Sequence, residues 1–161
     1  MEFKNLGALA LHLATLQAEQ VRLLQHGLER CAKRIEKTAK EEIGHYQAAA
    51  GPFPAWEQLA DSTDQEKARL GYPVDAPLLA SGTMRDESFK HEVAGLEAIV
   101  GSTDKKMVYH EFGTSKMPPR PVFGPALFKN RAFIEKTIGR AAMSGLIGGD
   151  RIHPSLGYDS E

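Results

Sequence analysis

The stretch "YHEFGTSKMPPRPVFGPAL", residues 109–127, determines how the chain is organised around it. It begins in a run with strand-like alternation that ends at Gly113, where a glycine permits a tight turn, and it finishes in a helical pattern. Between these points, prolines fix φ and bias the residues before them towards extended geometry. They are Pro118, Pro119 and Pro121. We therefore predict a stiff connector that loses little entropy on docking and suits protein–protein contact better than catalysis. The alternative is a rigid connector with no partner.

Residues 5–46 predict a long first helix. Apolar side chains recur there at steps of three or four; they are Leu9, Leu13, Leu16, Leu24, Leu28, Cys31, Ile35, Ala39 and Ile43. Asn5 suits the N-cap, no proline interrupts the stretch, and Gly27 is its one weak point. A single helix of this length would span roughly 60 Å, which exceeds the diameter of one small domain. Either the helix breaks near Gly27, or part of it packs on another subunit.

The rest of the chain predicts short elements. The segment "GPFPAW" ends the first helix, and residues 51–81 are irregular apart from a short helix in "STDQEKARLG". Three extended runs follow, in "MRDESFKHEV", "LEAIVGS" and "KMVYHEFG", joined by "AG" and "STDK", which have turn chemistry. A second helix runs from about Gly124 to Leu146, with Pro125 in its first turn.

These elements predict an α+β fold. It has a long N-terminal helix, a three-stranded or larger antiparallel sheet, and a C-terminal helix packed on the sheet. We expect a single domain over residues 1–147, including the irregular segment 51–81, and a flexible C-terminal tail over residues 148–161.

Composition restricts the class of protein. The chain has 161 residues, of which 42% are hydrophobic and 25% charged, and its formal net charge of −1 argues against a dedicated nucleic-acid binder. Cys31 is the only cysteine, so no internal disulfide can form, and no apolar run is long enough to span a membrane. We expect the protein to be made in the cytoplasm.

The charge is unevenly distributed along the sequence. Residues 57–111 carry eleven acidic and six basic side chains, whereas residues 116–140 carry six basic and one acidic. This division reflects either ordinary solvated faces or head-to-tail self-association, in which the basic surface of one subunit meets the acidic surface of its neighbour.

We expect no enzyme activity, no cofactor and no metal. The six histidines lack zinc-site spacing, and the sequence has neither a phosphate loop nor a G-x-S-x-G nucleophile motif. His110 and Glu111 are adjacent, so on a strand they would point to opposite faces. Cys31 falls on the apolar stripe of the first helix and reads as a core residue. Trp56 is either an anchor for a partner or, as such residues more often are, a cap on the core under a loop.

Two motifs resemble a known family, the tail-completion and head–tail joining proteins of long-tailed bacteriophages. The first is a "Y…hEFGT" strand end followed by "mPaRPf…pAl", and here it comprises Tyr109, Glu111, Phe112, Gly113, Thr114, Met117, Pro118, Arg120, Pro121, Phe123, Pro125, Ala126 and Leu127. The second is similar to the virion-morphogenesis branch, and comprises Trp56, Leu59, Thr63 and Lys67, followed by "APLLASGTMRDES". One departure is Val122, which stands between the Arg-Pro pair and Phe123. The resemblance covers about residues 32–141, which excludes the first 25 or so.

The resemblance implies a structural virion protein that resembles a tail terminator. Such proteins form a ring at the head-proximal end of the tail, end growth of the tail tube and join tail to head. The ring is a hexamer in tails, whereas a dodecamer is typical of portals and their adaptors. The implied partners are other copies of the chain, the tail tube protein and the neck or head connector proteins. DNA would pass through the lumen without specific binding, and no membrane is involved.

The expected interface is the connector with its flanking residues. It consists of Glu111, Phe112, Gly113, Thr114, Lys116, Arg120, Pro121 and Phe123. We expect Phe112 to pack inward at the strand end, and Lys116 and Arg120 to contact a neighbouring subunit or the tail. One alternative is a neck or head-closure connector between portal and tail. A remote alternative is a small cytoplasmic regulatory or nucleic-acid-binding module.

Overall fold

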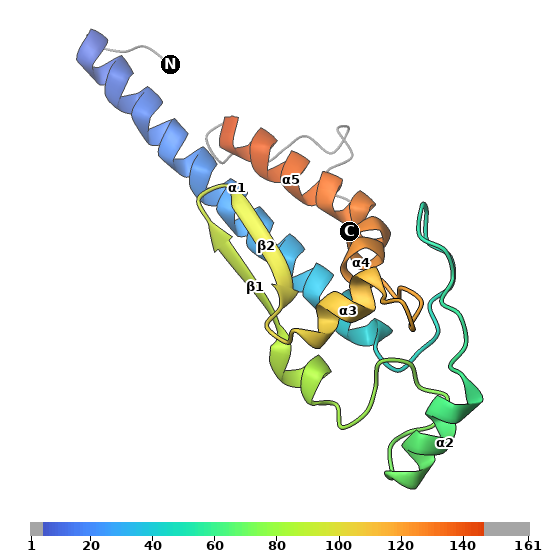
Figure 1. Ribbon diagram of the computed structural model, residues 1–161. Coiled ribbons are helices and arrows are strands. Elements are labelled where there is room, and N and C mark those ends of the chain that lie inside the picture. Colours follow the sequence, from blue (N-terminus) through green and yellow to red (C-terminus); the bar gives the residue numbers. More distant parts are fainter. Residues whose placement is uncertain (1–4, 147–161) are drawn as a thin grey trace. The chain divides into compact units, whose positions relative to one another are not determined.

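The computed structural model describes residues 5–146, which form five α-helices, one π-helical turn and a two-stranded antiparallel sheet (Figure 1). The chain groups into two compact units. Unit 1 comprises Met1–Cys31, Val93–Ala98 and Ala132–Glu161, and unit 2 comprises Ala32–Glu92 and Ile99–Arg131. The predicted mixture of helix and strand is confirmed, whereas the predicted third strand is wrong. The tail expected over residues 148–161 lies outside the described residues.

Helix α1, Leu6–Glu42, is one continuous helix of 37 residues. Asn5 caps it as expected, because its Oδ1 accepts a hydrogen bond of 2.8 Å from the backbone N–H of Ala8. The helix does not break at Gly27, so that alternative is wrong. Gly27 is instead a packing position, since a Cβ placed there would lie 3.4 Å from the Ala141 side chain.

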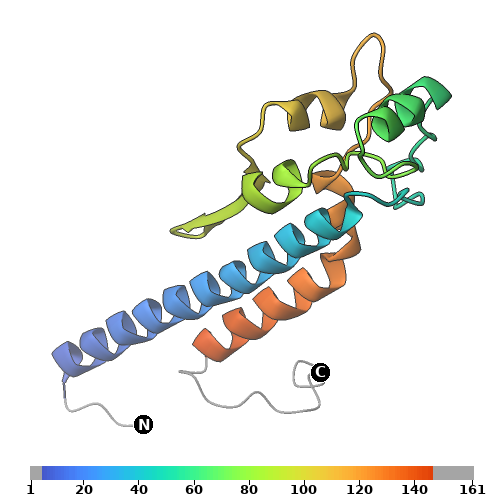
Figure 2. The ribbon, with the colours of Figure 1, turned by 90° about the horizontal axis from the view of Figure 1, so that it is seen from below.

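Unit 1 is built on the pairing of α1 with α5, Arg131–Leu146, which lie side by side in both ribbon views (Figures 1 and 2). Gly145 on α5 allows the close approach, because a Cβ there would lie 2.8 Å from the Gln20 Cα atom, whereas a Cβ at Gly27 would make an ordinary contact with α5. Cys31 is buried at the end of this seam, in agreement with its expected core position. Burial raises the pKa of its thiol.

The sheet consists of β1, Phe89–Ala94, and β2, Glu97–Ser102, joined by a turn at Gly95 with φ of +59°. Phe89, His91 and Val93 are less exposed than the residues between them, which confirms the predicted alternation. A π-helical turn, Met84–Ser88, leads into β1, and the Ser88 hydroxyl donates to the Met84 carbonyl at 2.5 Å.

The third run, "KMVYHEF", is not a strand but helix α3, Lys106–Phe112. Asp104 explains the difference, because its carboxylate accepts a hydrogen bond of 2.9 Å from the backbone N–H of Lys106. The inward side chains are Met107, His110 and Glu111, which have helical spacing. The segment "STDK" is therefore a helix start rather than a hairpin turn.

The second predicted helix is divided into α4, Phe123–Lys129, and α5. Asn130 separates them, because its buried side-chain amide donates to the Ala126 carbonyl and the Thr38 hydroxyl, both at 2.8 Å. Arg34 Nε completes the arrangement by donating to Asn130 Oδ1 at 2.9 Å. The short helix expected in the irregular segment is confirmed as α2, Asp61–Arg69. No helix within residues 5–146 is long and apolar enough to cross a membrane.

Candidate functional site

Unit 2 holds the proline connector, residues 113–121, between α3 and α4. Gly113 begins it with φ of +73° and ψ of 179°, a conformation that is essentially restricted to glycine. Thr114 and Met117 then form a β-bridge, with the Thr114 N–H donating to the Met117 carbonyl at 2.9 Å. The backbone of the connector is therefore fixed by its own hydrogen bonds as well as by its prolines.

Arg120 fastens the connector to the irregular segment. Its side chain is buried, with 5% of the residue exposed, and Nη2 donates to the carbonyls of Glu57 and Gln58 at 3.1 and 3.3 Å. Its backbone N–H donates to the His110 carbonyl at 2.6 Å, at the end of α3. One residue thus ties three segments together.

Trp56 and Glu111 hold the far end of the connector. Trp56 Nε1 donates to the Pro121 carbonyl at 3.2 Å, and Glu111 Oε2 accepts from the backbone N–H of Val122 at 2.8 Å. Phe123 then packs edge-on against Phe89, with 5.2 Å between the ring centroids. Both motifs of the sequence meet here.

Two expectations for single residues are wrong, and one open alternative is decided. Phe112 does not pack inward: it ends a helix rather than a strand, and 78% of it is exposed. Arg120 is not presented to a partner, because the residue is buried and its Nη2 donates to carbonyls of its own chain. Trp56 is only 6% exposed, which agrees with the favoured alternative, a cap on the core under a loop, and not with a partner anchor. Lys116 is exposed, as its expected role requires.

The exposed face of α3 is a feature that sequence reasoning missed. Val108, Tyr109 and Phe112 are each more than half exposed, and we call these three residues the α3 patch. Their common face follows from helical spacing, which the strand assignment concealed. Exposed aromatic side chains that share a face are typical of protein–protein contacts.

A hollow of about 550 Å³ lies beneath the connector. It is lined by residues 57–60, Leu78–Ala80 and the connector, with His110 and Arg120 among its walls. Burial lowers the pKa of His110, and the positive charge of Arg120 lowers it further. The imidazole is consequently neutral at physiological pH, and its buried Nδ1 has no partner among the described residues.

We predict that His110 makes the fold sensitive to mild acid. Its pKa is lowered in the folded state from about 6.5, so the unfolded chain binds the proton more readily below that pH. The contribution of His110 to stability is complete above about pH 6.5 and is lost as pH falls through the folded pKa. His110→Gln should therefore reduce the drop in urea midpoint between about pH 7.5 and about pH 5.5. An unchanged drop would contradict this role.

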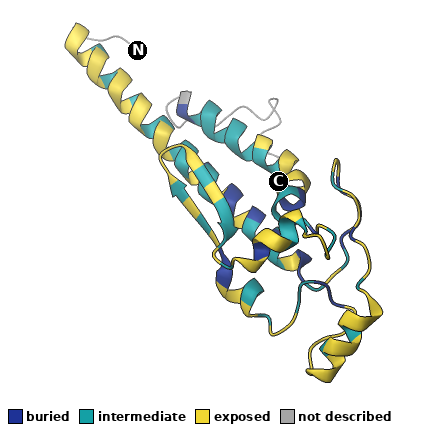
Figure 3. Cartoon of the chain, viewed as in Figure 1, coloured by how far each residue is buried: buried dark blue, intermediate teal, exposed yellow. Residues whose placement is uncertain are grey.

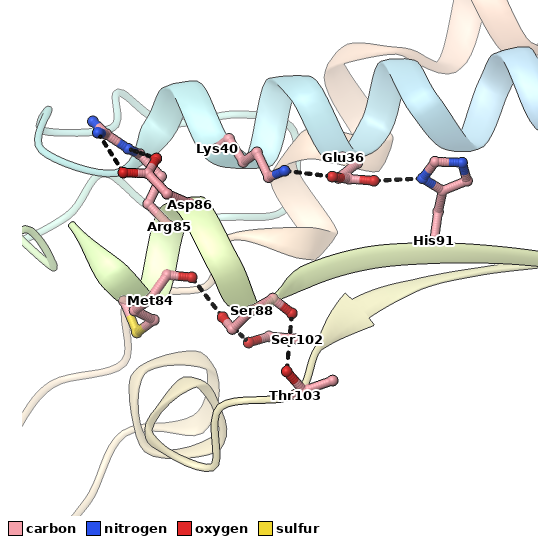
Figure 4. Close-up of polar contacts among 9 residues, drawn as sticks. All are labelled: Glu36, Lys40, Met84, Arg85, Asp86, Ser88, His91, Ser102 and Thr103. Atoms are coloured by element: carbon pink, nitrogen blue, oxygen red, sulfur yellow. Dashed lines mark hydrogen bonds and ion pairs between the residues drawn. The ribbon is translucent and has the colours of Figure 1, made fainter.

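A second polar cluster in unit 2 joins α1 to β1 (Figure 4). Glu36 accepts hydrogen bonds from Lys40, at 2.5 Å, and from His91 Nδ1. Burial raises the pKa of Glu36, but the bonds from Lys40 and His91 outweigh it, so the pKa lies below its ordinary value. The cluster fastens a strand to a helix and contains no nucleophile positioned against a base.

Within residues 5–146, no group of three or more His, Cys, Asp or Glu side chains is arranged to hold a metal ion. The chain matches no protein-family model, and no curated protein or solved structure is detectably similar to it.

Proposed function

We propose that this chain is a structural virion protein that forms a ring at the head-proximal end of a phage tail. The ring ends growth of the tail tube and joins the tail to the head. Its partners are further copies of itself, the tail tube protein and the head connector. The protein acts by assembly and not by catalysis, and DNA slides through the lumen without being held.

The proposal is carried by one observation: the two motifs of the family resemblance are bonded to each other. Trp56 belongs to the motif that resembles the virion-morphogenesis branch, and it donates to Pro121 of the connector motif. Arg120 of the connector motif in turn holds the carbonyls of the two residues that directly follow Trp56. Trp56 thus holds in place a connector residue that lies 65 positions further along the chain. This supports the idea that the two motifs together keep the proline connector rigid, so that it can serve as an assembly contact.

The geometry assigns different tasks to the residues of the expected interface. Glu111, Arg120 and Pro121 hold the connector in place through their bonds inside the chain. The α3 patch remains available to a partner, with Phe112 as its most exposed aromatic side chain. A ring requires the same heterologous contact at each subunit boundary, and a pre-stiffened edge makes that contact at low entropic cost.

The experiment is to delete the gene from the phage or prophage that encodes the chain and to image the particles by negative-stain microscopy. We expect filled heads and separate tails of irregular length, and complementation with a tagged copy should place the tag at the tail–head junction. Sixfold symmetry of the tagged ring fits the tail terminator, and twelvefold symmetry fits the neck connector instead. Intact infectious virions without the chain would refute both.

A further inference from the structure

The hollow beneath the connector has the size and the lining of a small-molecule site. Its volume of about 550 Å³ lies within the range of roughly 300–1,000 Å³ that such sites occupy. Helix α2 contributes Thr63 and Lys67 to one wall, and no residue of this helix is buried (Figure 3). The hollow therefore offers a ligand polar groups as well as an apolar wall, which includes Leu59, Leu78, Leu79, Met117 and Pro118.

Arg120, on the wall of this hollow, is a buried cation without a counter-ion. Its Nη2 is bonded to two carbonyls, but its Nε is buried without a partner, and no carboxylate in the described part of the chain forms an ion pair with it. Carbonyl groups have no net charge, so the charge of the guanidinium is not neutralised. Buried charges in proteins are ordinarily paired, because an isolated one is far more costly than a buried polar group. An anion in the hollow would supply the missing charge.

The other charged groups of the lining favour the same kind of ligand. Lys67 and Lys116 line the hollow with Arg120, whereas Glu57 is the one acidic residue of the lining and is exposed. The Lys67 ammonium donates to the Ala76 carbonyl, so it is partly occupied, but the exposed Lys116 side chain makes no bond to a described residue. The lining therefore has an excess of positive charge, which attracts an anion.

We propose that the hollow beneath the connector binds a small carboxylate with an apolar stem. Arg120 and Lys116 attract the carboxylate, and the apolar wall covers the stem. Inorganic phosphate would satisfy the charges but would leave that wall uncovered. A carboxylate of this kind comes either from a free aliphatic acid or from the carboxyl-terminal residue of a peptide. The inference does not rest on the proposed ring, because the purified chain is sufficient to test it.

The test is titration of the full chain with sodium hexanoate at pH 7.5, followed by the backbone amide resonances in NMR spectra, with sodium chloride as the reference for ionic strength. We expect saturable shifts confined to the connector, residues 57–60 and their neighbours, with a Kd of about 1 mM. Hexanamide, which has the same stem without the charge, should bind at least about tenfold more weakly. N-acetyl-leucine mimics the end of a peptide: tighter binding than that of hexanoate identifies a peptide terminus as the source, and weaker binding identifies a free acid.

A pair of lysine variants tests the location of the site. Lys116→Met should weaken hexanoate binding by about threefold, because it removes one charge from the lining. Lys105→Met is the matched control: Lys105 is exposed at the start of α3 and does not line the hollow, so its replacement should leave the Kd unchanged. Arg120 is left in place in both variants, because its loss destabilises the connector that forms the hollow.

Three results would overturn the inference. The first is the absence of saturable shifts around the hollow with both hexanoate and N-acetyl-leucine. The second is binding of hexanamide or of inorganic phosphate as tight as that of hexanoate, which would show that the hollow does not recognise a carboxylate on an apolar stem. The third is equal weakening by Lys116→Met and Lys105→Met, which would show that the overall charge of the protein and not the hollow attracts the anion.

Discussion

Arg120→Met should destabilise the protein by about 3 kcal/mol, although Arg120 belongs to a segment that looks like an exposed basic loop. The substitution keeps much of the buried aliphatic volume but removes the donor that holds the Glu57 and Gln58 carbonyls. It also removes a buried charged side chain that lies between the connector and residues 57–60. Urea unfolding at pH 7.5, followed by circular dichroism, measures the loss.

Lys116→Met is the matched control for Arg120→Met. Lys116 lies on the same connector and is exposed, and its side chain makes no bond to a described residue. Its replacement should change the free energy of unfolding by no more than about 0.5 kcal/mol. Equal effects of the two substitutions would mean that Arg120 does not hold the connector.

Gly113→Ala, made on its own, should lower the free energy of unfolding by about 3 kcal/mol, for a different reason. With φ of +73° and ψ of 179°, Gly113 has a conformation that an L side chain rarely adopts. An added Cβ would also lie 2.9 Å from both the Met117 carbonyl oxygen and the Pro119 nitrogen. Both are backbone atoms, and the bridge to Thr114 and the proline ring prevent them from moving aside.

Gly101→Ala provides the comparison for Gly113→Ala. No atom lies within 4 Å of a Cβ at Gly101, and its φ is not positive. The free energy of unfolding should therefore change by no more than about 0.5 kcal/mol. If Gly113→Ala were as mild as Gly101→Ala in urea unfolding, the connector would be far more adaptable than its geometry implies.

Local patterns were sufficient to predict α1, α2 and the β-hairpin. The apolar periodicity of α1, the alternation of the first strand and the Asn5 cap are properties of neighbouring residues, which a sequence displays directly. The third strand was mistaken because Met107, Tyr109 and Glu111 alternate as a strand would. The helical alternative requires His110 and Glu111 to point inward, and polar residues seldom signal a buried face. Asp104, just before Lys105, was the signal for a helix start.

The candidate site could be located from the sequence but not assigned in detail. The proline cluster marked the connector correctly, because proline and glycine act on the local backbone. The burial of Arg120 could not be foreseen, since its partners are carbonyls 62 and 63 residues earlier in the chain. From the sequence alone, an arginine between prolines is expected to be exposed, because the segment that covers it is distant in the chain. The same distance in sequence hid the bond from Trp56 to Pro121.

The central claim is that the α3 patch is an assembly contact, and complementation of a phage that lacks its own copy of the gene tests it most directly. Phe112→Ser should leave the urea midpoint almost unchanged, because Phe112 is 78% exposed, yet it should lower the titre of infectious particles by at least about tenfold. Val74→Ser, which removes another exposed apolar side chain of unit 2, should restore the wild-type titre. A wild-type titre from folded Phe112→Ser protein would contradict the account.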